Sequence, residues 1–260
     1  MSIFHQPPEG IKMGQRRWVA YLLTLLIMIA LWHAASLLLG SNLLPGPLPV
    51  FTRLGKEIGQ NVFWGHLQAS AWRMIAGLFC ASLTAIPFGL ILGSSQRLDR
   101  MFAPLIYISY PIPKIVLMPV ILLLFGLGDA SKIVLIALIT FFQLLITTRD
   151  SVRKISTEVI YSLKSLGGNR WHFYRHVVWP VSLPGIFTSL RIGTGTAVAV
   201  LFFVESISAR RGLGLYLIDS WGRADYNAMF VGIIALSAIG IVLYEIFDIL
   251  EKRVCKWRNP

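Results

Sequence analysis

The feature that most constrains this chain is a series of long apolar runs that carry almost no formal charge. Hydrophobic residues make up 55% of the 260 residues and charged residues 14%, whereas a soluble domain carries about 25% charged residues. A helix of about 20 mainly apolar residues crosses the bilayer core. The composition therefore excludes an ordinary soluble domain and predicts an all-α polytopic membrane protein.

Six runs approach or exceed the length of a membrane helix. We predict about six transmembrane helices in one domain, residues 18–258, after a polar tail at residues 1–17. The expected spans are 18–39, 74–96, 102–127, 131–149, 184–204 and 228–250, with a polar segment at 151–183 between the fourth and fifth spans.

The basic residues are unevenly distributed over the loops between these spans. Cytoplasmic loops favour Lys and Arg. With the N-terminus inside, fifteen Lys and Arg residues lie on the cytoplasmic side and six on the other side. This predicts both termini in the cytoplasm. The net charge of +12 then belongs to short loops near lipid headgroups, so no nucleic-acid partner is expected.

The third run contains Pro104, Pro111, Pro113 and Pro119. Proline removes a backbone donor and kinks a helix. Irregular backbone at membrane depth is tolerated only where protein or a water-filled cavity covers it. Two interpretations stay open: this span faces the interior and lines a pathway, with Pro111 and Pro113 as candidates, or Pro104 starts the helix and the other prolines merely bend it.

Three cations lie in or beside the expected spans, namely Arg73, Lys114 and Arg191. Ionisable groups inside a membrane often mark a binding site, so these cations are candidates for attracting an anion. Arg73 and Arg191 are within reach of the headgroups, and snorkelling is the favoured interpretation for both. The depth of Lys114 stays open because the prolines make its register uncertain.

Glu205 ends the fifth run and is expected to pair with Arg210 or Arg211 and to fix the loop that follows, with a role in the pathway as the alternative. The five histidines and the two cysteines form no cluster with metal-ligand spacing. We therefore expect no catalytic site, no metal and no cofactor in this chain.

The segment 151–185 is too long for a simple turn between two spans. Ile155, Val159, Leu163 and Leu166 share one face at helical spacing, which predicts a short amphipathic helix. Two such helices would form a compact knob in the aqueous phase. A hairpin that lies flat on the lipid surface is the alternative.

Two glycines divide this segment. Gly167 and Gly168 can adopt positive φ and end the first helix. Asn169 is a suitable N-cap for a second helix. Pro180 is expected to stop that second helix.

The spacing from Gly167 through Val177 to Pro180 is similar to that in the cytoplasmic loop of binding-protein-dependent ABC importer permeases. Further landmarks follow in order over residues 40–258: Leu44-Pro45-Gly46-Pro47, His66, Ser70, Arg73, Phe125-Gly126-Leu127-Gly128-Asp129, Lys132, Leu183-Pro184-Gly185-Ile186, Leu190-Arg191-Ile192-Gly193, Glu205 and Gly212-Leu213-Gly214. Together they resemble the nitrate/sulfonate/taurine-type branch. One departure stands out, because the family's Glu-Ala-Ala is replaced here by Tyr161-Ser162-Leu163.

The resemblance implies the permease subunit of an ATP-driven importer in the bacterial inner membrane. It implies a second permease copy, expected as a homodimer, two ATP-binding ABC subunits that hold ATP and Mg, and an extracytoplasmic solute-binding protein. The chain itself has no Walker phosphate loop. The contact with the ATPase is expected at Tyr161, Ser162, Leu163, Leu166, Gly167, Gly168, Val177 and Pro180.

The solute implied by the resemblance is a small anion such as a sulfonate, taurine, nitrate or bicarbonate. The candidate pathway residues are Arg73, Pro111, Pro113, Lys114 and Glu205. An ion-coupled secondary transporter is the alternative function. Such proteins usually carry mid-span carboxylates and inverted repeats, which this sequence does not display.

Overall fold

The computed structural model describes residues 13–40 and 43–258, and within these ranges it contains helices but no strand. In chain order the helices are α1 (Met13–Leu39), α2 (Pro47–Ile58), α3 (Asn61–Ser94), α4 (Gln96–Ser109), η1 (Lys114–Leu117), α5 (Met118–Phe125), α6 (Asp129–Arg153), α7 (Thr157–Ser165), α8 (Arg170–Phe173), η2 (Tyr174–Val178), α9 (Trp179–Ser208), α10 (Leu213–Gly222), α11 (Tyr226–Val254) and η3 (Lys256–Arg258). Five helical stretches are long and apolar enough to cross a membrane, and the bent pair around η1 makes a sixth if it counts as one span. The prediction of an all-α polytopic membrane protein is confirmed.

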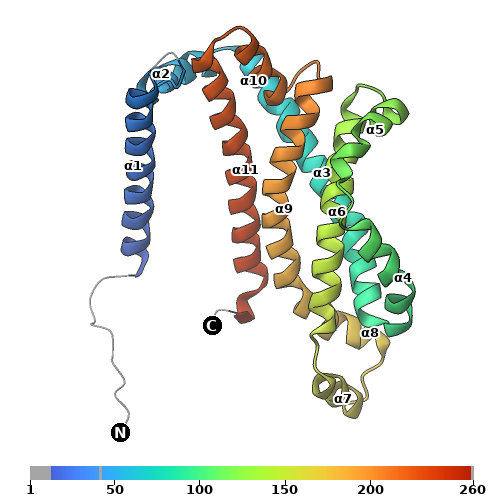
Figure 1. Ribbon diagram of the computed structural model, residues 1–260. Helices are drawn as coiled ribbons and strands as arrows, with labels where there is room; N and C mark the ends of the chain where they lie inside the picture. Colours follow the sequence, from blue (N-terminus) through green and yellow to red (C-terminus); the bar gives the residue numbers. More distant parts are fainter. Residues whose placement is uncertain (1–12, 41–42, 259–260) are drawn as a thin grey trace.

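The centre of the bundle is the packing of α3 against α6, and α9 lies beside α6 and contacts both of these helices (Figure 1). Glycines of α3 make this approach possible. A Cβ at Gly89 would lie 2.7 Å from Cβ of Thr148, and one at Gly93 would lie 2.6 Å from Cβ of Val152. Small residues four apart let two membrane helices approach closely, so the sequence GxxxG is used here as a packing surface.

Helix α3 is longer than the span expected at 74–96. It begins at Asn61, so Arg73 lies within the helix and not at the start of a span. The sequence suggested an end at Arg73 because a charge usually marks the edge of the apolar zone. Here the arginine is 5% exposed and pairs with carboxylates inside the bundle, so the helix continues past it.

The third span, expected at 102–127, is not one helix. Helix α4 ends at Ser109, and the next helical residues, Lys114–Leu117 and Met118–Phe125, are bent from it by 80°. Pro111 and Pro113 lie in the break, where they cannot supply the backbone donors that a continuous helix needs. Pro104 and Pro119 lie inside α4 and in the first turn of α5 and are tolerated there.

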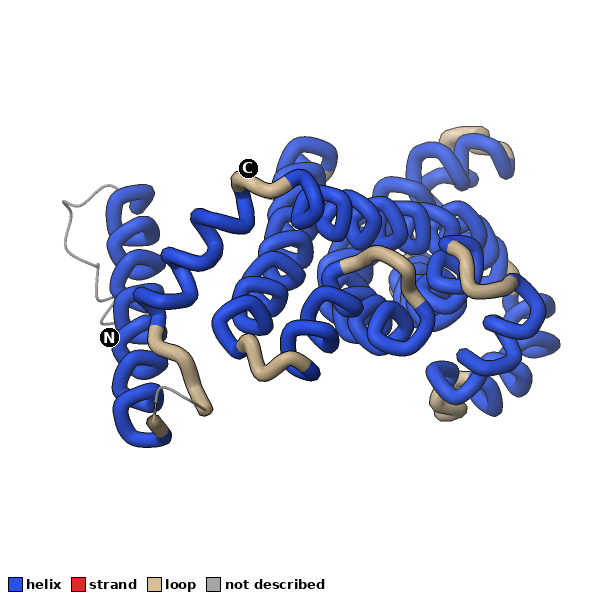
Figure 2. The backbone as a smooth tube through the Cα atoms, turned by 90° about the horizontal axis from the view of Figure 1, so that it is seen from above, coloured by secondary structure: helices blue, strands red, loops and turns tan. Residues whose placement is uncertain are grey.

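Helix α1 stands at one edge of the molecule and reaches the rest mainly through α2, as the two views show (Figures 1 and 2). Trp32 of α1 stacks on Phe230 of α11 with ring centroids 5.7 Å apart, and its indole donates to the carbonyl of Pro45 at 3.0 Å. The other described apolar side chains of α1 are mostly exposed. Short helices α2 and α10 cover one end of the bundle, and α7 projects beyond the other end.

Candidate functional site

The segment between α6 and α9 folds into two short helical pieces, as predicted. Helix α7 begins at Thr157, so Ile155 precedes it and does not belong to its apolar face. The helix ends in a tight turn in which the amide of Gly167 donates to the carbonyl of Lys164, and that of Gly168 to the carbonyl of Leu163, both at 2.9 Å. This is the Schellman pattern, and Gly167 has the positive φ of 73° that the turn requires.

The second piece begins at Asn169, as predicted. Asn169 Oδ1 accepts a hydrogen bond from the amide of His172 at 3.0 Å, and His172 Nδ1 accepts one from the amide of Asn169 at 3.4 Å. This capping box fixes the start of α8. The expectation that Pro180 stops the helix is wrong. Pro180 follows directly after the π-helical turn Tyr174–Val178, and α8, η2 and α9 continue through it as one helical stretch, Arg170–Ser208.

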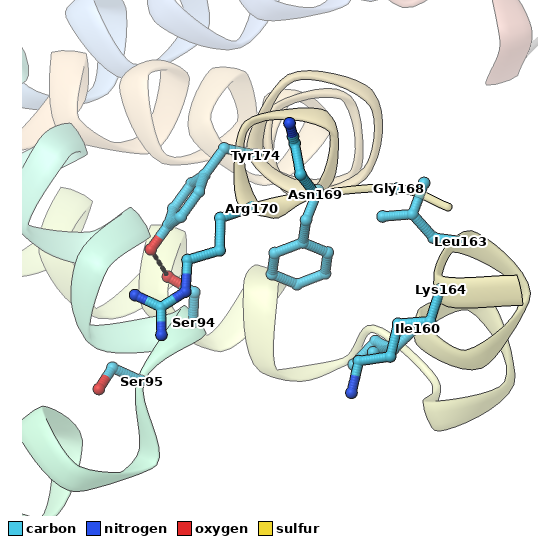
Figure 3. A pocket seen from close by; sticks show the side chains of 10 residues that line it. Ser94, Ser95, Ile160, Leu163, Lys164, Gly168, Asn169, Arg170 and Tyr174 are labelled. Carbon is cyan, nitrogen blue, oxygen red and sulfur yellow. Dashed lines mark hydrogen bonds between the residues drawn. The ribbon is translucent and has the colours of Figure 1, made fainter. Parts of the chain in front are cut away.

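A cavity of about 460 Å³ separates α7 from the end of α3 (Figure 3). Ile160 and Leu163 of α7 form one wall, and Phe173 and Tyr174 form another. The hydroxyl groups of Tyr174 and Ser94 are 2.8 Å apart and form the hydrogen bond drawn in Figure 3. The loop is therefore tied to α3 as well as to α9.

The residues predicted to contact an ATPase differ in exposure. Tyr161 is 63% exposed and Leu166 is 86% exposed, whereas Val177 is only 7% exposed and packs inside the bundle. The remaining members of the predicted set divide in the same way: Ser162 and Gly167 are exposed, and Leu163, Gly168 and Pro180 are half-buried. Trp171, at 65% exposure, belongs to the exposed group, although it was not in the predicted set.

At the opposite end of α9 lies a buried cluster of charges. Glu205 is fully buried and its Oε1 is 2.5 Å from Nη1 of Arg73. Nη2 of the same arginine is 2.7 Å from Oδ1 of Asp129, at the start of α6. The hydroxyl of Ser70 donates to Glu205 at 2.8 Å. A buried charge is stable when it is paired and hydrogen-bonded in this way.

The same cluster holds the loop that follows α9. The amide of Gly214 donates to Oε2 of Glu205 at 2.9 Å, and the carbonyl of Arg211 accepts from Arg73 at 2.6 Å. Glu205 thus fixes this loop as predicted, but its cation is Arg73 and neither Arg210 nor Arg211. The snorkelling expected for Arg73 is also wrong, because the guanidinium points into the bundle.

Lys132 and Arg191 are also held within the bundle. Lys132 is fully buried, and its ammonium donates to three backbone carbonyls, including that of Ser208 at 3.0 Å. Arg191 pairs with Asp248 at 2.5 Å and with Glu251 at 2.8 Å, so it does not snorkel to lipid but joins α9 to α11. Asp248 also pairs with Lys252, one turn further along α11.

Lys114 lies at the break between α4 and η1. Its ammonium donates to the carbonyls of Ser109 at 3.0 Å and Tyr110 at 3.1 Å, and lies 4.4 Å from the ring centroid of Phe142. Lys114 lines a second cavity, of about 410 Å³, together with Pro111 and Pro113. Of the candidate pathway residues, these three are brought together, and Arg73 and Glu205 belong to the separate buried cluster.

Sequence reasoning named most members of the buried cluster without seeing that they meet. His66, Ser70, Arg73, Lys132 and Glu205 were landmarks in separate segments. It missed Ser94 and Phe173 beside the loop, because neither stands out by charge or spacing. Within the described ranges, no group of His, Cys, Asp or Glu side chains could hold a metal ion.

Comparison with known proteins agrees with this geometry. Residues 85–256 match the family of binding-protein-dependent transport system inner membrane components. The chain is 33% identical to the taurine transport system permease protein of Escherichia coli (strain K12), over 91% of this chain and 88% of that protein. It is 28% identical to the putative aliphatic sulfonates transport permease protein of Bacillus subtilis (strain 168), over 95% and 91%.

Two further comparisons bear on solute and fold. The riboflavin transport system permease protein of Chloroflexus aurantiacus is 31% identical over 90% of this chain and 88% of that protein. A chain of the MetNI methionine ABC transporter, crystallised in an inward-facing conformation, superposes on this chain with a TM-score of 0.60. The identity is 19%, and the superposition covers 73% of this chain and 94% of that chain. The protein therefore belongs to the binding-protein-dependent transport system inner membrane components, as a permease subunit of an ATP-driven importer whose ATPase is a separate subunit.

Proposed function

We propose that residues 157–178 dock into a groove of the separate ATPase subunit and transmit its movement to the membrane spans. The observation that supports this proposal is that the second half of the loop and the fifth span form one continuous helix. Helices α8, η2 and α9 form one helical stretch, Arg170–Ser208, so a displacement of the loop moves the fifth span with it. Coupling between distant sites requires such a packed element with two arrangements.

The exposed tip of the loop supports the same proposal. Tyr161, Leu166 and Trp171 expose large apolar or aromatic surfaces, and α7, which carries Tyr161, projects beyond the end of the bundle. Aromatic side chains are common at the centre of protein interfaces. Tyr161 occupies the position of the family's Glu, so contact there rests on the phenol ring and not on a salt bridge.

We propose that two copies of this permease assemble as a homodimer on two ATPase subunits, which bind ATP and Mg. The exposed apolar side chains of α1 support a surface shared between the second copy and lipid. Helices α2 and α10, at the end remote from α7, form a suitable surface for an extracytoplasmic solute-binding protein. This arrangement has both termini in the cytoplasm, in agreement with the distribution of Lys and Arg.

The solute proposed is a small anion, with sulfonates and taurine preferred over nitrate or bicarbonate. The names of the taurine and aliphatic sulfonate relatives support this choice. The riboflavin relative indicates that solute varies within the family. An ion-coupled secondary transporter is not favoured, because the family is that of ATP-driven importers.

Copurification of the ATPase with tagged variants of the chain tests the docking proposal. Leu166→Glu introduces a charge at the most exposed apolar position of the loop and should abolish both copurification and ATP-dependent uptake. The matched control is Leu48→Glu on α2, where the side chain is 75% exposed at the opposite end. Unchanged association in Leu166→Glu would contradict the proposal.

A second pair of variants tests close approach at Gly167. A Cβ at this position meets nothing within 4 Å in the chain itself, so an effect of size reports on a partner. Asn tolerates positive φ and should retain association, whereas Gly167→Trp should lose it. Equal behaviour of Gly167→Asn and Gly167→Trp would show that no partner surface lies against this glycine.

A further inference from the structure

The break in the third span forms one wall of a cavity at mid-height in the bundle. The cavity has a volume of about 410 Å³, and α6 and α9 complete its walls. Phe142 and Gln143 lie close to the midpoint of α6, and Thr196 lies close to that of α9. Solute sites of membrane transporters are commonly found at this depth, where broken helices expose backbone groups.

Lys114 gives this cavity a positive charge that no carboxylate neutralises. Its three N–H donors are used by the carbonyls of Ser109, Tyr110 and Ile112. Carbonyl dipoles stabilise an ammonium but do not cancel its charge. Across the described residues, no Asp or Glu forms an ion pair with Lys114, in contrast to Arg73 and Arg191.

The ammonium of Lys114 also lies at the C-terminal end of α4, where its charge opposes the negative end of the helix dipole. The last carbonyls of a helix are unpaired and form the negative end of its dipole. Here two of them, on Ser109 and Tyr110, face Lys114 and not the open cavity. Without the lysine, the same carbonyls would disfavour an anion nearby.

Two polar side chains in the cavity have no partner. The side chains of Gln143 and Thr196 line it, and neither forms a hydrogen bond with another described group. Both side chains are half-buried at the wall of the cavity, so their donors are available to a ligand with acceptor oxygens. The remaining walls are apolar, with Ile115, Ile139 and Val200.

We propose that this cavity is a solute site for a small organic oxyanion with an apolar body, such as an alkyl sulfonate. Lys114 supplies the attracting charge, and Gln143 and Thr196 donate hydrogen bonds to the oxyanion. Ile115, Ile139 and Val200 contact the apolar body. The inference rests on the importer function and names the class of solute, because an inorganic anion would leave the apolar walls uncovered.

Charged thiol reagents measure the potential in the cavity without knowledge of the physiological solute. The variant Ile139→Cys is made in the full chain with Cys80 and Cys255 replaced by Ala, assembled with its ATPase in membrane vesicles of both orientations. The rate of modification is measured with a sulfonate-bearing methanethiosulfonate and with its trimethylammonium counterpart. Adding Lys114→Met should lower the ratio of the anionic to the cationic rate by about tenfold, because one unit charge acts oppositely on the two reagents.

Two controls separate charge from damage to the fold. Lys56→Met removes an exposed lysine of α2 and should leave the ratio unchanged. Lys114→Arg keeps the charge and should keep the ratio near that of the parent. An unchanged ratio in Lys114→Met, or no reaction of Ile139→Cys with either reagent in either orientation, would overturn the proposal.

Protection experiments test the chemical class of the solute. Hexanesulfonate should slow modification of Ile139→Cys, and hexyltrimethylammonium at the same concentration should not. Gln143→Leu or Thr196→Val should weaken the protection by hexanesulfonate. Equal protection by nitrate would overturn the organic part of the proposal. These readouts require no ATP, so they can fail or succeed independently of the docking of the loop on the ATPase.

Discussion

The two ends of α9 differ in their surroundings: one end is held by buried, hydrogen-bonded charges, and the other leads into a loop with exposed apolar side chains. At one end, Glu205 is fully buried and bonded to Arg73, Ser70 and an amide of the following loop. At the other end, α9 runs without a break into a loop that exposes Leu166. In the described part of the chain, one side-chain hydrogen bond, between the hydroxyls of Tyr174 and Ser94, joins this loop to α3. The charged groups at the Glu205 end thus find their partners within this chain.

This difference indicates where the molecule can move. A buried ionic network has one low-energy arrangement, because any separation leaves a charge unpaired. A surface loop with few tertiary bonds can shift at low cost. One helix joined to both kinds of end can transfer a displacement from the loop to the bundle while its far end stays fixed to α3 and α6.

The largest effect should come from removing the carboxylate of the buried cluster. Glu205→Ala leaves the Arg73 guanidinium, which is 5% exposed, with the half-exposed Asp129 as its remaining carboxylate partner among the described residues. We expect a loss of about 3–5 kcal/mol in the free energy of unfolding, measured in detergent by chemical or thermal denaturation. If the cluster contributed little rigidity, the loss would be below about 1 kcal/mol.

A double variant is the control for this prediction. Replacing both partners, as in Arg73→Met with Glu205→Leu, removes the stranded charge and fills the space with apolar groups. Replacement of a whole buried pair is often close to neutral. The double variant should therefore be more stable than Glu205→Ala, and the opposite order would show that the lost packing of Glu205 is the cause.

A smaller effect is expected from Gly212→Ala beside the cluster. Gly212 has φ of 147°, and a Cβ there would overlap the carboxylate of Glu205. The strained backbone and the displaced carboxylate should together cost about 2 kcal/mol. Gly167→Ala in the loop has φ of 73° but open space around the Cβ, so it should cost about 1 kcal/mol. Similar losses of stability in Gly212→Ala and Gly167→Ala would show that the two ends of α9 do not differ in how tightly they are held.

The sequence predicted the elements better than their ends. The apolar runs and the glycine pair at 167–168 predicted the spans and the turn between two short helices, because both depend on local chemistry. The start of α3 was predicted thirteen residues too late, at residue 74 in place of Asn61. The cause is Arg73, whose partners come from α6 and α9 and are invisible to a local pattern.

The candidate site shows the same limit. Asn169 was predicted as a cap because its partner lies three residues away. Pro180 was predicted to end a helix because proline usually does, whereas the helix continues through it next to the π-helical turn Tyr174–Val178. The pairing of Glu205 with Arg73 could not be chosen over pairing with Arg210 or Arg211, since sequence proximity favours the wrong partners.

The single bond between the loop and α3 gives the next prediction. Tyr174→Phe removes the hydroxyl pair with Ser94 and should free the loop while leaving the bundle intact. The site is exposed, so the expected loss is about 0.5 kcal/mol and local to the loop. Hydrogen exchange of residues 157–173 should accelerate, whereas exchange in α3 should not change. Tyr161→Phe, whose hydroxyl forms no hydrogen bond with another described group, is the matched control and should have no effect.

The smallest effect concerns the start of α7. The nearby hydroxyl of Ser156, and to a smaller extent the backbone amide of Glu158, lower the pKa of the Glu158 carboxyl below its usual 4.5. Because the folded-state pKa is lowered, the contribution to helix stability is present above 4.5 and is lost as the pH falls through the lowered pKa. Carbon NMR of labelled Glu158 should give a titration midpoint below 4.5 that rises in Ser156→Ala. If the midpoint for Glu158 is the same in both proteins, Ser156 does not order the first turn of α7. The start of α7 would then be as mobile as the rest of the loop.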